Sequence, residues 1–216
     1  MVIAHRGAWG PPPQNSLEAF ARAIELGCDG IELDVRRTAD GRLVVVHDAR
    51  VGGRPVSGLT RARLRAPLLS EVLDLAAGRI VVDVELKQDG YVEQAMEQIA
   101  ARLSPDSYVV TSFVDAVLPQ VKCACPQART GLLVGPRLRR RELDGRIRRA
   151  AADLLAPHVS LVRRGILTWA AQRGLPAWIW TANDPRALRR LSAAPQVEAL
   201  ITDKPRIALA IVDGRM

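Results

Sequence analysis

The sequence predicts an α/β protein in which eight parallel strands close into a compact (β/α)8 barrel, and three observations support this prediction. Short, β-rich apolar runs alternate with longer amphipathic stretches along the chain. There are eight such runs, the number of strands that closes a (β/α)8 barrel. The 216 residues, 48% of them hydrophobic, suffice for one domain of this kind. An open doubly wound sheet is the competing arrangement.

The predicted strands and helices follow one another in order. The strands are residues 2–5, 30–35, 80–86, 107–111, 128–134, 152–156, 176–181 and 198–202. Helical periodicity lies between them, for example over residues 17–26, 92–103, 166–173 and 185–191. Before the first helix, Asn15-Ser16 with Glu18 predicts an N-cap and a capping-box carboxylate. No linker, repeat or low-complexity tract divides the chain, so we expect a single domain over residues 1–216.

One segment breaks the alternation directly after the second strand. Residues 43–47 follow that strand after too few residues for a parallel crossover. We therefore predict a small β-hairpin inserted after strand 2, with Asp40-Gly41 in its turn. If the turn is centred on residues 39–40, the numbers of paired residues sum to about 79, which places Glu32 opposite His47.

Polar side chains gather at the carboxyl ends of the first three parallel strands and of the hairpin. Because side chains two apart in a strand share a face, these groups interrupt otherwise apolar elements on one side. Burying them unpaired would cost several kcal/mol, so they need a ligand or one another. In barrels and doubly wound sheets, functional groups collect at this edge. The group comprises His5, Arg6, Glu32, Asp34, His47, Asp83, Glu85 and Lys87.

Three of these carboxylates and the two histidines have the character of a catalytic metal site. Glu32, Asp34 and Glu85 offer hard oxygen ligands, which suit Mg²⁺ or Ca²⁺ better than Zn²⁺. His5 and His47 can act as general acid and base on either side of a reacting group.

Two cations complete the pattern. Arg6 can hold a phosphate through two hydrogen bonds, whereas Lys87 acts as a point charge or neutralises Glu85. A metal, two imidazoles and two cations together describe phosphoryl chemistry on a small anionic substrate.

Seven motifs also occur in order over residues 3–205: AHRG, PPPQNSLEAF, GIELDVRRTADGRLVVVHD, VDVELK, TSF, WTAN and LITDKP. This series resembles the glycerophosphodiester phosphodiesterase family. The resemblance implies a TIM barrel with a hairpin after the second strand. It also implies metal-dependent hydrolysis of glycerophosphodiesters to glycerol 3-phosphate and an alcohol.

The resemblance further implies roles for individual residues. Glu32, Asp34 and Glu85 would hold one divalent cation, Mg²⁺ or Ca²⁺ with Mn²⁺ as a further option. His5 and His47 would be the acid–base pair, and Arg6 and Lys87 would contact the phosphate.

Two further substrate-binding residues are expected at strand ends. Ser112, within the TSF motif, offers a hydroxyl for a glycerol-sized ligand, although capping of the loop is an equal alternative. Trp180, by its place in WTAN, should line the pocket, and core packing is the expectation for Trp178.

The chain departs from the family pattern at four places, the mildest of which is Ser16 where threonine is usual. Gln14 stands where the family usually has glutamate, and Asp83 where asparagine is common. The segment after Asp48 is shorter than the family's insertion that caps the glycerol site. Two alternatives therefore stay open: a phospholipase D-like or cyclising phosphodiesterase on lysophospholipids, and a non-catalytic, basic polyanion-binding barrel.

Composition bears on partners and location. The net charge is +8, and its densest run, residues 137–149, contains Glu142 and Asp144 but no aromatic residue to stack on bases. We therefore expect a solvated helix face there and no nucleic-acid partner. Three cysteines argue against a disulfide framework. Without a signal pattern or a long apolar run, a cytoplasmic protein with no membrane span is expected.

Overall fold

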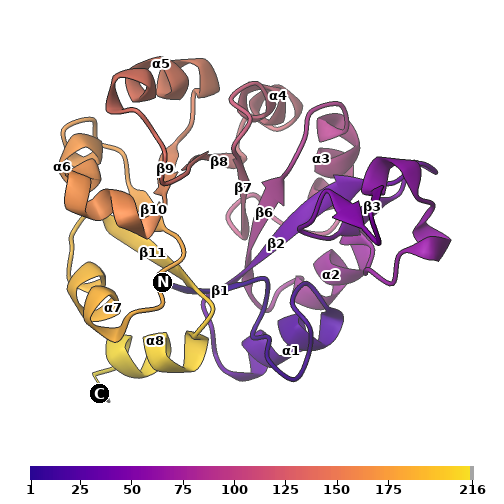
Figure 1. Cartoon of the computed structure of the whole chain (residues 1–216), viewed down its shortest axis with the longest axis horizontal. Helices are drawn as coiled ribbons and strands as arrows, with labels where there is room; N and C mark the ends of the chain where they lie inside the picture. The colour runs from indigo at the N-terminus through magenta and orange to yellow at the C-terminus, as the bar shows by residue number, and fades with distance from the viewer. Residues whose placement is uncertain (215–216) are drawn as a thin grey trace.

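Eight parallel strands close into a barrel in the computed structural model, which describes residues 1–214 (Figure 1). Hydrogen bonds join β1 to both β2 and β11, and this closes the ring. The predicted (β/α)8 barrel is confirmed, and each predicted strand is present within two residues at either end. The barrel strands are β1 (Val2–His5), β2 (Gly30–Arg37), β6 (Val81–Leu86), β7 (Tyr108–Ser112), β8 (Arg129–Val134), β9 (Leu154–Pro157), β10 (Ala177–Ile179) and β11 (Val197–Thr202).

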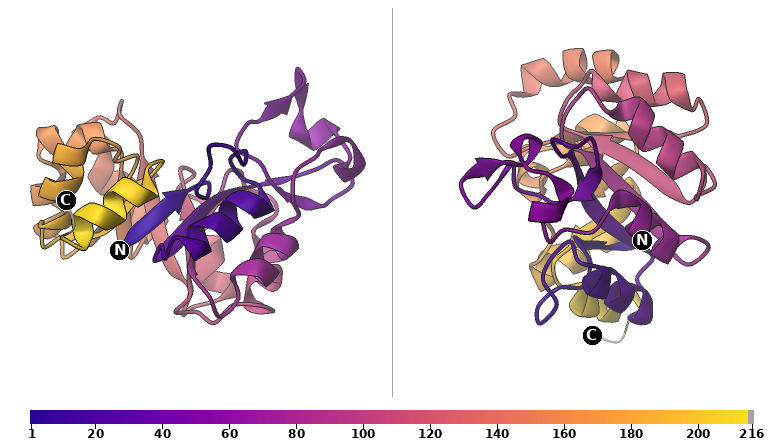
Figure 2. Two further views of the ribbon diagram at one scale, coloured as in Figure 1. Left: turned by 90° about the horizontal axis from the view of Figure 1, so that it is seen from below. Right: turned by 90° about the vertical axis from the view of Figure 1, so that its right-hand side faces the viewer.

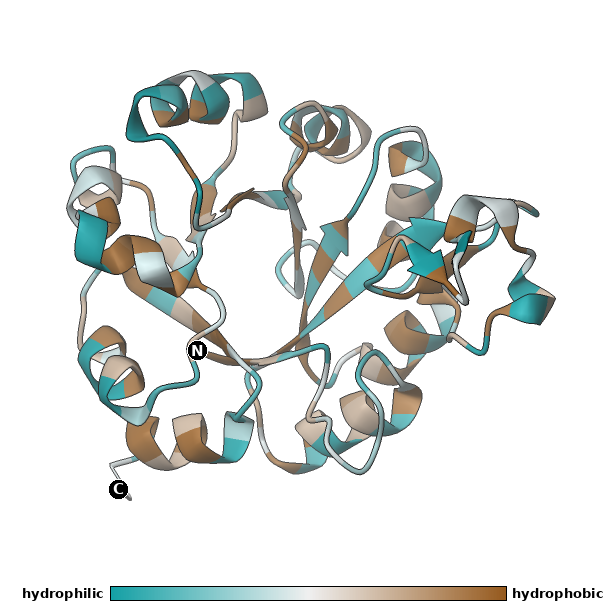
Figure 3. Ribbon diagram, viewed as in Figure 1, coloured by the Kyte–Doolittle hydropathy of each residue, from teal (hydrophilic) through white to brown (hydrophobic). Residues whose placement is uncertain are grey.

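Helices surround the barrel as an outer ring (Figure 1). They are α1 (Leu17–Glu25), α2 (Leu69–Ala76), α3 (Val92–Ala100), α4 (Val117–Ala124), α5 (Arg140–Ala150), α6 (Ile166–Ala171), α7 (Pro185–Ser192) and α8 (Pro205–Val212). Three short 3₁₀ turns lie at Val56–Gly58, Arg61–Arg63 and Val159–Arg164. Helix α5 covers most of the arginine-rich run and is largely hydrophilic (Figure 3), as expected for a solvated face. None of the helices within residues 1–214 is long and apolar enough to cross a membrane.

The apolar core has two layers, separated by the strands. Ile31, Leu33 and Val35 of β2 face outwards into the layer beneath the helices. A second cluster, which includes Ile3 and the fully buried Trp178, fills the inside of the barrel. Because residues alternate along each strand, the remaining positions of β2 and β6 also face inwards. Their acidic side chains therefore lie above this apolar plug.

The hairpin after strand 2 is confirmed, but its register differs from the prediction. Strand β3 (Leu43–Val45) is antiparallel to β2, and Val35 pairs with Val45 instead of Val44. The loop has three residues, and its last, Gly41, has φ +74°, a conformation that suits glycine. The extra loop residue shifts the pairing by one. The prediction that Glu32 lies opposite His47 is therefore wrong, and His47 follows the end of β3.

The chain after His47 forms a compact projection beside the barrel. A second hairpin, β4 (Arg50–Val51) with β5 (Arg54–Pro55), projects beyond the carboxyl ends of the barrel strands (Figure 2). Beneath it, Val44, Val56, Leu59 and Leu64 form a small buried cluster. This projection therefore has a core of its own.

The start of α1 also differs from the prediction. Ser16 is the N-cap, and its hydroxyl accepts a hydrogen bond from the amide of Ala19 (3.1 Å). Asn15 lies outside the helix with φ +57°, a conformation that asparagine tolerates better than most residues. The predicted capping box of Asn15 and Glu18 is wrong, because the cap is one residue later and Asn15 turns towards the barrel.

Candidate active site

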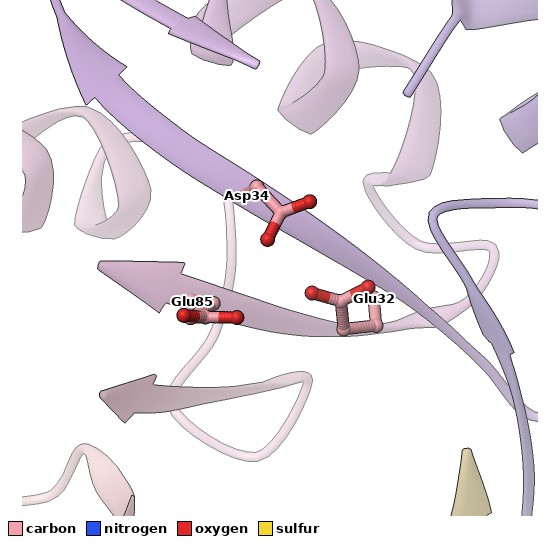
Figure 4. A group of neighbouring side chains, drawn as sticks. All are labelled: Glu32, Asp34 and Glu85. Carbon is pink, nitrogen blue, oxygen red and sulfur yellow. The ribbon is translucent and has the colours of Figure 1, made fainter. Parts of the chain in front are cut away.

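Three carboxylates from two neighbouring strands meet at the carboxyl end of the barrel. Glu32 and Asp34 come from β2 and Glu85 from β6, and the parallel register pairs Asp34 with Glu85. One oxygen of each lies within 4.8 Å of the others, and the side chains turn towards a shared space (Figure 4). Their exposed fractions are 4%, 0% and 7%. Such a group of buried carboxylates is costly unless cations accompany it.

Two basic side chains supply part of this compensation. The ammonium of Lys87 lies 2.8 Å from Asp34 Oδ1 and 2.7 Å from Glu85 Oε1. The Nε atom of Arg6 lies 3.3 Å from Asp34 Oδ2, and the backbone amide of Arg6 donates to Glu32 Oε2 (3.0 Å). Lys87 therefore contacts two carboxylates, whereas the sequence offered Glu85 as its partner.

The surroundings shift the pKa values of the three carboxyl groups in different directions. Burial would raise the pKa of Asp34, but Lys87 and Arg6 outweigh it and the pKa lies below its ordinary value. Burial raises the pKa of Glu85 to about 7 although Lys87 opposes the shift. Burial and the neighbouring Asp34 and Glu85 raise the pKa of Glu32 well above its usual range. Three ionised carboxylates would carry one more charge than Lys87 and Arg6 neutralise, and the raised pKa values of Glu32 and Glu85 reflect this excess.

The chemistry of this cluster fits a hard divalent cation. All three candidate ligands are carboxylate oxygens, the donors that Mg²⁺ and Ca²⁺ prefer. Two further buried oxygens nearby, Asp83 Oδ2 and Asn15 Oδ1, have no hydrogen-bond partner. Buried polar atoms are normally satisfied, so orphaned atoms at this place indicate a polar ligand.

His5 ends β1 and is held by a carboxylate from the last strand. Its Nδ1 atom lies 2.6 Å from Asp203 Oδ1, and its Nε2 atom lies 3.9 Å from Glu32 Oε2. The amide of Asn183 donates to the other oxygen of Asp203 (2.6 Å). Burial would raise the pKa of Asp203, but the hydrogen bonds from His5 and Asn183 hold it below the ordinary value. The ionised carboxylate accepts a hydrogen bond from Nδ1–H, which leaves Nε2 free for proton exchange in the pocket.

His47 enters the same site from the segment after β3. Its Nδ1 atom lies 2.8 Å from Asp48 Oδ1. The backbone carbonyl of His47 accepts two hydrogen bonds from the guanidinium of Arg36 (3.0 and 2.9 Å), which fix this part of the chain. Burial lowers the pKa of His47, and the hydrogen bond to Asp48 opposes that shift. A neutral imidazole near pH 7 suits proton transfer.

These side chains line one pocket with a polar and an apolar part. The polar part contains both histidines, both basic residues and the carboxylates Glu32, Asp83 and Glu85. The apolar part contains Phe113, Leu133, Trp180 and Ile201, and Thr111 also lines the pocket. Trp180 packs edge-on against Phe113 (5.5 Å between ring centres) and donates from its indole nitrogen to the carbonyl of Ala156 (2.7 Å). A charged phosphate with a small alcohol group matches this division.

Ser112 is the one predicted site residue that the structure keeps out of the site. It is fully buried, donates to the carbonyl of Leu86 (2.7 Å) and accepts from the amide of Val114 (3.1 Å). Side chains alternate along β7, so Thr111 and Phe113 face the pocket and Ser112 faces away. The structure therefore assigns Ser112 to loop capping, the alternative that the sequence had left open.

Sequence reasoning did not assign Asn15 or Asp203 to the site, although both hydrogen-bond to predicted site residues. Asn15 donates to Asp34 Oδ2 (2.8 Å), and Asp203 holds His5. Asp203 follows the last strand just as the other carboxylates lie at strand ends, so position alone could have identified it. The contact of Asn15 with Asp34 depends on the loop between β1 and α1, and local pattern instead favoured a helix cap.

Comparisons with known proteins agree with this geometry. The pattern of the Glycerophosphoryl diester phosphodiesterase family matches residues 5–207. A "Glycerophosphodiester phosphodiesterase" of Caldanaerobacter subterraneus is 30% identical over 98% of this chain and 97% of its own length. The name of this relative is that of an enzyme of the same family.

Solved structures share the fold. A glycerophosphodiester phosphodiesterase from Parabacteroides distasonis has a TM-score of 0.82 at 24% identity and covers 99% of this chain and 97% of its own. An Oleispira antarctica phosphodiesterase, solved with the product sn-glycerol-3-phosphate, has a TM-score of 0.87 at 22% identity. It covers 98% of this chain and 96% of its own. With its barrel, its site and its match over nearly the whole length, the chain belongs to the glycerophosphoryl diester phosphodiesterase family and is a phosphoric diester hydrolase.

Proposed function

We propose that this protein hydrolyses glycerophosphodiesters to glycerol 3-phosphate and an alcohol, with a divalent cation and with His5 and His47 as the acid–base pair. The observation that carries the proposal is the convergence of three carboxylates, two cations and two histidines on one pocket. The name of the Caldanaerobacter relative and the product in the Oleispira structure support the substrate class. We take residues 1–216 as one catalytic domain.

The basic side chains bind and orient the phosphate. Arg6 and Lys87 both line the pocket while they contact Asp34, so each can offer further N–H groups to phosphoryl oxygens. A cation held by Glu32, Asp34 and Glu85 would withdraw charge from the phosphoryl oxygens and lower the pKa of an attacking hydroxyl. Mg²⁺ and Ca²⁺ suit this oxygen-only ligand set.

The histidines move the protons. In both rings Nδ1 faces a carboxylate, Asp203 for His5 and Asp48 for His47. The Nε2 atoms are therefore the positions at which one ring takes the proton of the nucleophile and the other gives a proton to the leaving alcohol. Phe113 and Trp180 cover one side of the pocket and restrict water beside the reacting group.

The decisive experiment is release of glycerol 3-phosphate from glycerophosphocholine and glycerophosphoethanolamine. The expected result is turnover with Mg²⁺, Ca²⁺ or Mn²⁺ and none in EDTA. Activity that is unchanged in EDTA would refute the metal requirement. If the protein binds metal but cleaves neither diester, the proposed substrate class is wrong.

A further inference from the structure

A second hollow, which we call the outer groove, lies beside the active-site pocket. It is lined by residues 13–16 of the loop before α1 and by residues 45–48, Val51 and 64–67. His47 lines both this groove and the active-site pocket. The two hollows therefore lie on either side of one shared residue, His47 of the proposed acid–base pair.

The walls of the outer groove are mainly apolar. Pro13, Val46, Val51 and Pro67 line it, and the buried Leu64 forms part of its floor. Val51 is 38% exposed, so its side chain adds accessible apolar surface to the groove. Such walls offer contact area to a hydrocarbon chain.

The charged residues of the groove do not favour a charged ligand. Asp48 and Arg65 both line it, and their charges are opposite, so neither sign dominates. The carboxylate of Asp48 is also engaged by the imidazole of His47. An ammonium or a second phosphate would therefore gain little here.

The groove is built into the fold. Leu64 belongs to the buried cluster with Val44, Val56 and Leu59. Its backbone carbonyl accepts from the guanidinium of Arg61 (2.9 Å), whose amide in turn donates to Asp40 Oδ1 (3.0 Å). Preformed walls bind a ligand without first being ordered, which favours affinity.

From this placement we propose that the outer groove binds the second alcohol group of the substrate and that this group carries an aliphatic chain. The inference rests on the proposed function. A phosphodiester has two alcohol groups, and the pocket around Phe113 and Trp180 takes one of them. With the phosphate at Arg6 and Lys87, the other passes His47 and enters the groove. The substrate class is therefore alkyl-bearing phosphodiesters, in preference to those of small charged alcohols.

The test is a series of glycerophospho-alkyl diesters from methyl to hexyl, each used as a monomer in solution. For the wild-type protein, kcat/KM should rise about 2–4-fold per methylene, as burial of hydrocarbon predicts. A flat series would overturn the proposal.

Two variants locate the effect. Val51→Ser should flatten the dependence on chain length, and Ala66→Phe should block the longer chains. Val212→Ser is the matched control, because Val212 is 47% exposed at the end of α8 and lines neither hollow. If Val212→Ser flattened the series equally, the groove would not be its cause.

Two other outcomes separate this inference from its rivals. If Val51→Ser weakened action on anionic vesicles and left the monomer series unchanged, Val51 with Arg50 and Arg54 would be a lipid-surface contact, and the proposal would be wrong. If no diester were cleaved, the proposed function would fail. Calorimetry could then still test the groove by measuring the affinities of the hexyl and methyl diesters for the wild-type and Val51→Ser proteins. Equal affinities of the two diesters for the wild-type protein would refute the proposal.

Discussion

At the scale of single residues, each proposed proton carrier depends on a neighbour from elsewhere in the fold. His5 and Asp203 are 198 residues apart in the sequence, yet they share a hydrogen bond of 2.6 Å because β1 and β11 are adjacent. Asn183 accepts from the amide of Asp203 through its Oδ1 atom and donates to the carboxylate, so the carboxylate itself is fixed. This arrangement sets which nitrogen of His5 faces the pocket.

Replacing either histidine by alanine should abolish turnover and leave the fold intact. Both rings are partly exposed at the pocket, so the loss of stability should be small. We expect kcat to fall by about 10²–10⁴-fold, the usual contribution of a general acid or base. Product release and circular dichroism measure the two effects, and near-normal activity in either variant would contradict the assignment.

Asp203→Asn should be as harmful as Asp203→Ala, although asparagine keeps the shape. An amide can donate to Nδ1 of His5, which would place the proton on Nε2 and leave no acceptor in the pocket. We expect kcat to fall about 10²-fold or more with little change in KM. The ¹⁵N shifts of the His5 ring should report the exchanged tautomer, and an unchanged tautomer would refute this positioning role. Asp48→Asn, at an exposed pair, should cost less.

At the scale of elements, the turn after β1 is confined by helix α1. A Cβ atom at Gly7 would lie 2.7 Å from the backbone carbon of Ala19, and Gly7 has φ +84°. The same turn carries Arg6, itself at φ +58°, an uncommon conformation outside glycine. Close approach of this turn to α1 therefore fixes the positions of His5 and Arg6.

Gly7→Ala should lower both stability and kcat/KM, because the turn must move away from α1. Gly27→Ala is the matched control, since Gly27 has φ +74° and open space around its Cβ position. The control should lose about 1 kcal/mol of unfolding free energy from its backbone conformation and keep its activity. Thermal unfolding and kcat/KM measure both, and equal losses in the two variants would show that the contact with Ala19 is unimportant.

At the scale of the whole molecule, the barrel tolerates a concentration of buried acid at one end. Burial raises the pKa of Asp83 to about 8 and that of Glu85 to about 7. The folded protein therefore holds protons that the unfolded chain releases near pH 4. Stability that comes from these protons is present at low pH and is lost as the pH rises towards 8.

In EDTA, the protein should be less stable at pH 8 than at pH 6, by an amount on the order of 2 kcal/mol. A divalent cation should restore stability at pH 8 by binding the folded carboxylates. Asp83→Asn should reduce the dependence on pH, because an amide needs no proton to remain neutral. Thermal unfolding at both pH values tests this. A protein that is more stable at pH 8 than at pH 6 in EDTA would contradict the predicted direction of the pH dependence.

Much of the site was predictable because strand alternation is a local property. Glu32, Asp34 and Glu85 stand out as acidic residues on apolar strands, and the structure brings them together. Ser112 shows the limit of prediction from sequence motifs, since the same alternation turns its side chain away from the pocket. The position of Asn15 was not predictable, because its conformation depends on contact with β2.

Local sequence patterns were enough to predict the eight strands, the hairpin after the second strand and the carboxylate cluster. These features follow from hydrophobic periodicity and from spacing along single strands. The register of the hairpin, the partner of His5 and the outer groove beside His47 depend instead on contacts between distant parts of the chain. Closure of the barrel joins β1 to β11, which brings His5 to its partner, and the three-residue turn shifts the hairpin pairing by one residue. Neither feature can be read from the hydrophobic periodicity of a single segment.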